Sequence, residues 1–136
     1  MTLSLKNNSL LYQHLGKLFY AVAISDRTIQ DTEFEALQKC IHDYWIGYND
    51  LNQIFKENPA HTIEAVFEGV EAFGLEGHEM YGDFVSYKKE YPHLFTKPLN
   101  TLILDTAKTI AHAFGGIERS EQKILIALEK ELSTKD

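Results

Sequence analysis

Hydrophobic residues recur along this chain at intervals of three and four, the spacing that places them on one face of an α-helix. Polar residues fill the positions between them, and no stretch alternates residue by residue as a half-buried β-strand would. The pattern therefore predicts amphipathic helices from end to end. The predicted apolar faces are Leu11, Leu15, Leu18 and Val22 with Phe19; Phe34, Leu37, Ile41, Tyr44 and Tyr48; Ile63, Val66, Phe67, Val70 and Phe73; Tyr81, Phe84, Val85 and Tyr91; Leu99, Leu102, Ile103 and Ile110; and Ile124, Leu125, Leu128 and Leu132.

Helix-breaking residues separate these faces. Pro59 and Pro92 follow the ends of apolar runs, and Pro98 stands where the first turn of a new helix is expected. Gly74 and Gly77 end the run that begins near Ile63. The length of 136 residues suits one domain. We therefore predict an all-α fold, a compact bundle of six to seven helices in a single domain over residues 1–136.

The two ends of the chain repeat each other at an offset of 88 residues. Seven pairs carry like residues at this offset, including an Ile and a Glu outside the apolar faces. The repeat predicts two equivalent helical hairpins, over residues 9–48 and 98–133, with middle helices over 50–92 between them. The pairs are Leu11 and Leu99, Leu15 and Ile103, Val22 and Ile110, Ala23 and Ala111, Ile29 and Ile117, Glu33 and Glu121, and Leu37 and Leu125.

The corner of each hairpin has a structural interpretation. A small residue, Ala23 in the first copy, lets the chain turn closely, and Ile29 precedes the next helix, where it can pack onto its first turn. Glu33 and Glu121 then fall at the third helical position, where a carboxylate can accept hydrogen bonds from free backbone N–H groups. Acidic residues in a first turn also interact favourably with the helix dipole.

The same corners resemble a known family. The stretches AISDRTIQDTE and AHAFGGIERSE are similar to the Ala-x-x-Asp-Gly-x-Ile-x-x-x-Glu corners of the TerB-like domain. This family is associated with tellurite resistance and also occurs in the membrane-anchored DjlA co-chaperones. The resemblance covers most of the chain with its flanking helices. It implies a compact helical bundle whose corner acids form a site for a divalent cation.

Carried over residue by residue, the resemblance implies metal ligands at Asp26, Glu33 and Glu121, with calcium, magnesium or manganese as the ion. The chain departs from the family pattern at Arg27, which replaces a Gly, and at Phe114, which replaces an Asp. Calcium and magnesium require several oxygen ligands, and Asp31 would add a fourth carboxylate. Helix capping and cation binding are thus two open interpretations of the same acids.

The acidic charge is concentrated in one segment. The net charge is −7, and residues 57–87 contain seven acids but no Lys or Arg, whereas acids and bases balance elsewhere. Such a surface repels phosphate backbones, which excludes nucleic acid as an expected partner. Glu64, Glu68 and Glu71 share one helix face in an aromatic-rich region. This face has two interpretations, a docking surface for a basic protein partner and a solvated face over an aromatic core.

Other kinds of site find little support in the residues. The loop from Asp26 is not an EF-hand, because its sixth and twelfth positions are Asp31 and Leu37 rather than Gly and Glu. The six His are scattered without metal-binding spacing, and the lone Cys40 is expected to be a buried structural thiol. No apolar segment approaches membrane-spanning length, and the N-terminus lacks the core of a signal peptide.

A composition of 44% hydrophobic and 24% charged residues is typical of soluble globular proteins. We therefore expect a soluble, cytoplasmic protein. The resemblance to the TerB-like domain implies a non-enzymatic module that serves in stress response through protein partners. The alternative is a sensor of divalent cations that uses the acids of the two corners. No nucleophile–base pair or cofactor loop supports an enzyme.

Overall fold

The computed structural model describes residues 2–24, 31–45, 61–113 and 119–133, with side chains described from residues 10, 34, 61 and 122 onward in these segments. This part of the chain contains helices and no β-strand, so the predicted all-α fold is confirmed. None of its helices combines the length and apolar composition that crossing a bilayer requires. The elements are α1 (Thr2–Ala23), α2 (Asp31–Cys40), the π-helical turn η2 (Ile41–Trp45), α3 (His61–Phe73), α4 (Gly77–Glu90), the 3₁₀ turn η4 (Pro92–Leu94), α5 (Lys97–His112) and α6 (Arg119–Ser133).

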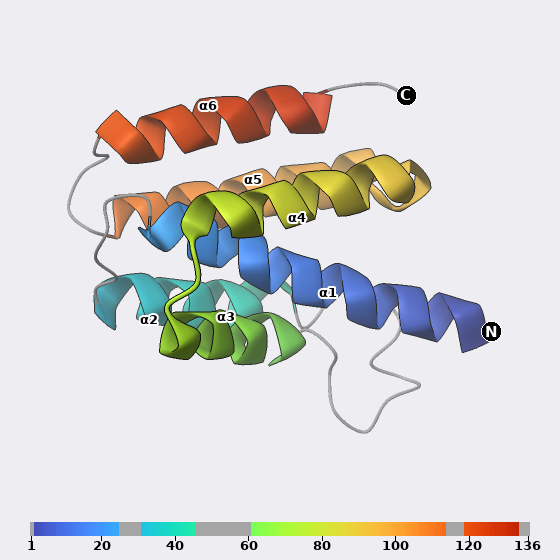
Figure 1. The fold of residues 1–136 in the computed structure, drawn as a ribbon, viewed down its shortest axis with the longest axis horizontal. Coiled ribbons are helices and arrows are strands. Elements are labelled where there is room, and N and C mark those ends of the chain that lie inside the picture. The colour runs from blue at the N-terminus through green and yellow to red at the C-terminus, as the bar shows by residue number, and fades with distance from the viewer. Residues whose placement is uncertain (1, 25–30, 46–60, 114–118, 134–136) are drawn as a thin grey trace.

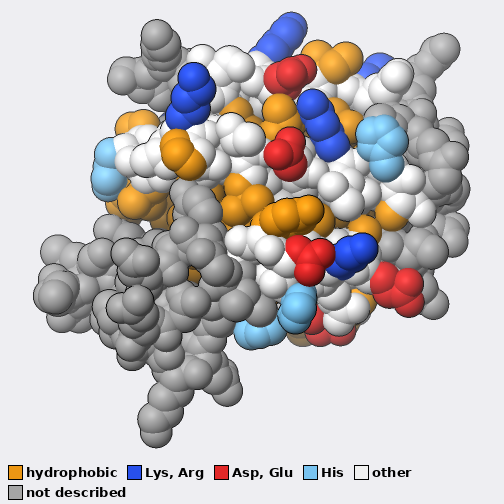
Figure 2. Space-filling model, turned by 180° about the vertical axis from the view of Figure 1, so that it is seen from behind, with side chains coloured by type: hydrophobic (Ala, Val, Ile, Leu, Met, Phe, Trp, Pro, Cys, Tyr) orange, Lys and Arg blue, Asp and Glu red, His pale blue; other side chains and the backbone are white. Residues whose placement is uncertain are grey.

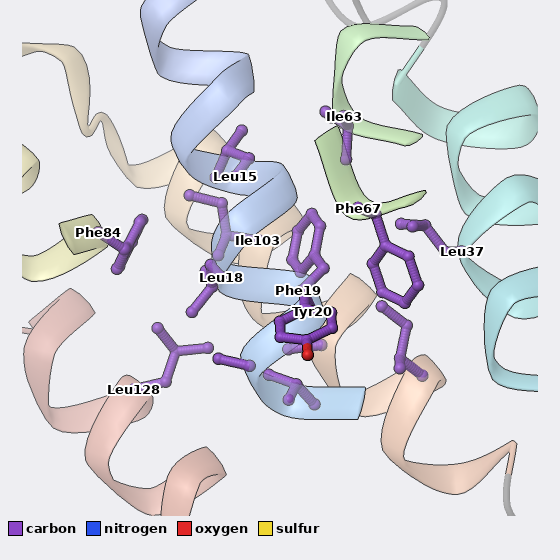
Figure 3. Close-up of a cluster of buried hydrophobic side chains, with 14 of the residues drawn as sticks. Leu15, Leu18, Phe19, Tyr20, Leu37, Ile63, Phe67, Phe84, Ile103 and Leu128 are labelled. Carbon is purple, nitrogen blue, oxygen red and sulfur yellow. The ribbon is translucent and has the colours of Figure 1, made fainter. Parts of the chain in front are cut away.

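Helix α1 is the centre of the bundle. It runs between α2 and α3 on one side and α4 and α5 on the other, and α6 forms the outer edge (Figure 1). Its second half is buried almost all round, as expected of a helix with neighbours on every side. Core residues from the other five helices surround it (Figure 3), namely Leu37 of α2, Ile63 and Phe67 of α3, Phe84 of α4, Ile103 of α5 and Leu128 of α6.

The internal repeat has a structural meaning in the core. Five of its seven pairs lie on described side chains, and both members of each are buried. The remaining two pairs, Ile29 with Ile117 and Glu33 with Glu121, fall outside the described side chains. The repeat therefore marks equivalent buried positions in α1 and α5 and in α2 and α6.

The α2–η2 segment departs from the predicted apolar face at one position. Regular α-helical spacing placed Tyr44 in the core, but its side chain is 59% exposed and Trp45 is buried instead. The reason is the π-helical turn, whose extra residue per turn rotates the following side chains around the axis. Trp45 then contacts α1 with edge-on ring packing against Tyr12 and Phe19.

The buried Trp45 also donates a hydrogen bond from Nε1 to Oγ1 of Thr106, at 3.0 Å. Thr106 donates in turn to the carbonyl of Leu102, so its hydroxyl links η2 to α5. We expect Thr106→Val to lower the free energy of unfolding by about 1 kcal/mol, because the shape is kept and the hydrogen bond is lost.

Urea denaturation followed by the fluorescence of the single Trp measures this effect. The matched control is Thr109→Val, an exposed residue of the same helix that makes the same kind of hydrogen bond to Asp105. An equal loss in the two variants would contradict a specific role for the Trp45 contact.

Candidate functional site

The predicted metal ligands lie outside what the structure describes. Asp26 belongs to the segment between α1 and α2, and the side chains of Glu33 and Glu121 are not among the described ones. Among the residues that are described, no three His, Cys, Asp or Glu side chains form a group that could hold a metal ion. The divalent-cation site at the corners therefore stays a prediction.

Cys40 lies in the core, as the sequence indicated. Its side chain is buried between α2 and α5, and burial raises the pKa of the thiol above its ordinary value, while hydrogen bonding to Thr109 and Thr106 acts in the opposite direction. A buried thiol with a raised pKa is a poor nucleophile. Cys40 is a structural residue of this interface.

The three glutamates predicted as a docking face divide into two kinds. Glu64 is half-buried and engaged within the protein, since Gln38 of α2 donates to its Oε2 at 3.0 Å and His61 Nδ1 lies 3.2 Å from its Oε1. Glu68 and Glu71 are exposed, one and two turns further along α3. Glu64 therefore ties α2 to α3, and the free part of the acidic face begins at Glu68.

An exposed apolar corner adjoins these acids. Phe73, the last residue of α3, is 82% exposed, and Leu75 is 41% exposed. The apolar periodicity of α3 places Phe73 on the buried face with Ile63, Phe67 and Val70, so its exposure is a difference from the sequence-based expectation. Phe73 is the last residue of α3, directly before the turn at Gly74. A Phe exposed to this degree loses most of the free energy that burial of its side chain would provide, about 1.5–3 kcal/mol.

The corner has a defined backbone conformation. Gly74 adopts φ +64°, which favours glycine, and ends α3 with two hydrogen bonds, Gly74 N–H to Glu71 O at 3.0 Å and Leu75 N–H to Val70 O at 3.3 Å. This pair of bonds is the Schellman motif. The Tyr20 hydroxyl of α1 donates to the Leu75 carbonyl at 2.7 Å and anchors the turn to the central helix.

The electrostatic surroundings of this corner are acidic. Burial raises the pKa of Tyr20, and the negative charges of Glu71 and Glu76 raise it further. Glu76 and Glu79 are exposed at the start of α4. The opposite face, formed by α2, α5 and α6, carries acids and lysines interspersed (Figure 2). We call the surface of Glu68, Glu71, Phe73, Leu75, Glu76 and Glu79 the α3–α4 corner.

Part of this surface could be predicted from the sequence. The run without Lys or Arg indicated an acidic face, and Glu68 and Glu71 belong to it. Phe73 and Leu75 were missed because helical periodicity assigns a residue to a face but does not show whether the end of a helix is covered. The available signal was Gly74, which ends α3 directly after Phe73. Comparisons of the chain with models of protein families, with curated proteins and with solved structures give no match.

Proposed function

We propose that this protein is a non-enzymatic interaction module of the TerB-like, stress-response type, and that it binds a basic segment of a partner protein at the α3–α4 corner. The resemblance of AISDRTIQDTE and AHAFGGIERSE to TerB-like corners supports the family assignment. The exposure of Phe73 inside an acidic surface supports the docking site.

The main support for the docking site is the combination of an exposed aromatic side chain, Phe73, with exposed glutamates around it. Aromatic residues that become buried on binding contribute a large share of the free energy at protein interfaces. A surrounding surface of carboxylates attracts positive partners, speeds their encounter and disfavours acidic ones. The partner segment that fits is therefore basic, with at least one apolar side chain that contacts Phe73.

Site-directed photo-crosslinking tests this proposal in the cells that make the protein. A photoreactive phenylalanine analogue at position 73 is expected to capture a defined partner, and the captured segment is expected to be rich in Lys or Arg. The same analogue at Ile126 is the matched control, because Ile126 is 55% exposed but lies on α6. Equal capture at both positions would contradict a site at the α3–α4 corner.

Substitutions at the corner separate binding from folding. We expect Phe73→Ser to reduce recovery of the captured partner at least about tenfold, the effect of losing an interface anchor of 1.4 kcal/mol or more. We expect its unfolding free energy to stay within about 0.5 kcal/mol of the parent value, because the side chain is already exposed. Co-purification measures the recovery of the partner, and urea denaturation measures the free energy of unfolding.

Charge reversal provides the second arm of this test. Glu68→Lys with Glu71→Lys is expected to weaken the same interaction, and raising the salt concentration is expected to weaken the parent interaction as well. A partner that tolerates both the reversal and the salt does not recognise the acidic surface.

A further inference from the structure

A hollow of the surface lies at the end of the α5–α6 pair where α5 begins and α6 ends. There the last turn of α4, the η4 turn, the start of α5 and the end of α6 come together (Figure 1). They enclose a cleft of about 800 Å³, within the size range of small-molecule sites. Phe95, Leu104 and Leu132 form apolar parts of its wall, and Lys88, Lys97 and Asn100 form polar parts.

Lys88 is the unusual residue of this cleft. It is only 3% exposed, and a buried ammonium group is expensive unless it is paired and hydrogen-bonded. Its Nζ lies 3.6 Å from Glu131 Oε2, longer than the roughly 2.7–3.2 Å of an N–H···O hydrogen bond, and 5.8 Å from the centre of the Phe95 ring. An ammonium group has three N–H donors. The Glu131 ion pair leaves donor capacity for an oxygen atom in the cleft.

Asn100 holds the neighbouring wall in place. Its Nδ2 donates to the carbonyls of Phe95 and Leu132, at 3.3 and 3.2 Å, and so joins α5 to the segment after η4 and to the end of α6. Its Oδ1 is buried and has no hydrogen-bond partner. The polar groups at this end of the cleft are therefore only partly satisfied by the protein.

The charge of the cleft differs from that of the rest of the molecule. The whole chain has a net charge of −7. The charged residues that line the cleft are Lys88 and Lys97 with a single acid, Glu129. Glu131 is not part of the lining and serves as counter-ion to Lys88. With Glu131 the charges balance, but the cleft surface itself presents two ammonium groups and one carboxylate to a bound molecule.

We propose that this cleft binds a small amphipathic carboxylate, with the carboxylate at Lys88 and Lys97 and the apolar body against Phe95 and Leu132. A carboxylate supplies the oxygen acceptors that the Lys88 ammonium group can take, and charge-assisted hydrogen bonds are the stronger class. The apolar wall gives affinity to a hydrocarbon or aromatic body. This site is separate from the α3–α4 corner and does not depend on a protein partner.

Three probes with the same body and different head groups test the proposal on the full chain. They are 4-phenylbutyrate, its neutral amide 4-phenylbutyramide and the cation 4-phenylbutylamine, each titrated while amide resonances are followed by NMR. We expect the carboxylate to shift the side-chain NH₂ signals of Asn100 and to bind at least about tenfold more tightly than the amide. Equal binding of the carboxylate and the amide, or the absence of shifts at Asn100 with the carboxylate, would overturn the proposal.

Substitutions of the two lysines test whether the carboxylate of the probe binds at Lys88 and Lys97. Lys97→Met changes an exposed residue. It is expected to lower the affinity for 4-phenylbutyrate several-fold without changing the fold. Lys88→Met is expected to lower the affinity for 4-phenylbutyrate at least about tenfold. Lys108→Met, an exposed residue of α5 away from this cleft, is the matched control and is expected to leave affinity unchanged.

A further variant separates binding from a purely structural role of Lys88. In Glu131→Gln the bound carboxylate becomes the counter-ion of Lys88, so affinity is expected to rise above that of the parent protein. If Lys88 were only structural and did not contact the ligand, Glu131→Gln would not raise the affinity. Unchanged affinity in Lys88→Met and Lys97→Met, both still folded by circular dichroism, would place the probe elsewhere and refute the site.

Discussion

Gly16→Val is expected to lower the free energy of unfolding by about 3 kcal/mol, the upper part of the usual range for overpacking a core. Gly16 lies where α1 crosses α3. A Cβ atom at this position would lie 2.7 Å from the backbone oxygen of Ile63 and 2.8 Å from the Cβ of Val66. Neither atom belongs to the end of a flexible side chain, so the two helices themselves would have to separate. Urea denaturation followed by Trp fluorescence and by circular dichroism measures the loss.

Two other helical glycines provide the control. An added Cβ at Gly69 of α3 or Gly82 of α4 meets no atom within 4 Å. Gly69→Ala and Gly82→Ala are therefore expected to raise the free energy of unfolding by about 0.5–1 kcal/mol, the difference in helix propensity between the two residues. If Gly16→Val were tolerated as well as these two, the close approach of α1 and α3 would be wrong.

The ion pair between Lys88 and Glu131 accounts for the second large effect. Glu131→Gln is expected to cost about 3 kcal/mol, because it leaves the ammonium group of Lys88 in a site where its side chain is 4% exposed without an anionic partner. Removing both charges in Lys88→Met with Glu131→Gln is expected to recover most of this loss, since no buried charge then remains. A double-mutant cycle in urea measures the coupling between the two residues.

The contrasting pair is Lys17 with Asp83, which joins α1 to α4 at 3.2 Å with side chains 30% and 49% exposed. Solvent screens this pair, so Asp83→Asn is expected to cost less than about 1 kcal/mol. A cost for Asp83→Asn as large as that for Glu131→Gln would show that burial does not distinguish the two pairs. Additive losses in the Lys88 and Glu131 cycle would show that these residues act independently.

Much of the helical framework could be predicted from local patterns. The apolar face of α6 is an example: Leu125, Leu128 and Leu132 are buried as their spacing predicted. The start of α5 is another, because Pro98 falls in the first turn and Thr96 caps the helix by accepting from Leu99 N–H. These features depend on residues within one or two turns of each other, and a sequence displays such neighbours directly.

The candidate sites were less accessible to sequence reasoning. Lys88 follows Phe84 by four residues and so shares its face of α4, yet its charge argued for a place in solvent. Its partner Glu131 lies 43 positions further along the chain, and nothing local connects the two. Glu64 was grouped with Glu68 and Glu71 by spacing alone, whereas Gln38 of another helix engages it.

By itself, the sequence determined that the chain is helical, where several helices end and which of their faces are apolar. It also contained the repeat at an offset of 88 residues, whose members with described side chains are all buried. Only the tertiary structure decided that α1 is central, that Phe73 at the end of α3 is exposed and that Lys88 meets Glu131. The physical reason is the separation along the chain of the residues that come into contact. Periodicity reports the preference of each helix face for water or core, but the choice of neighbour depends on the fit of distant segments, which no local pattern contains.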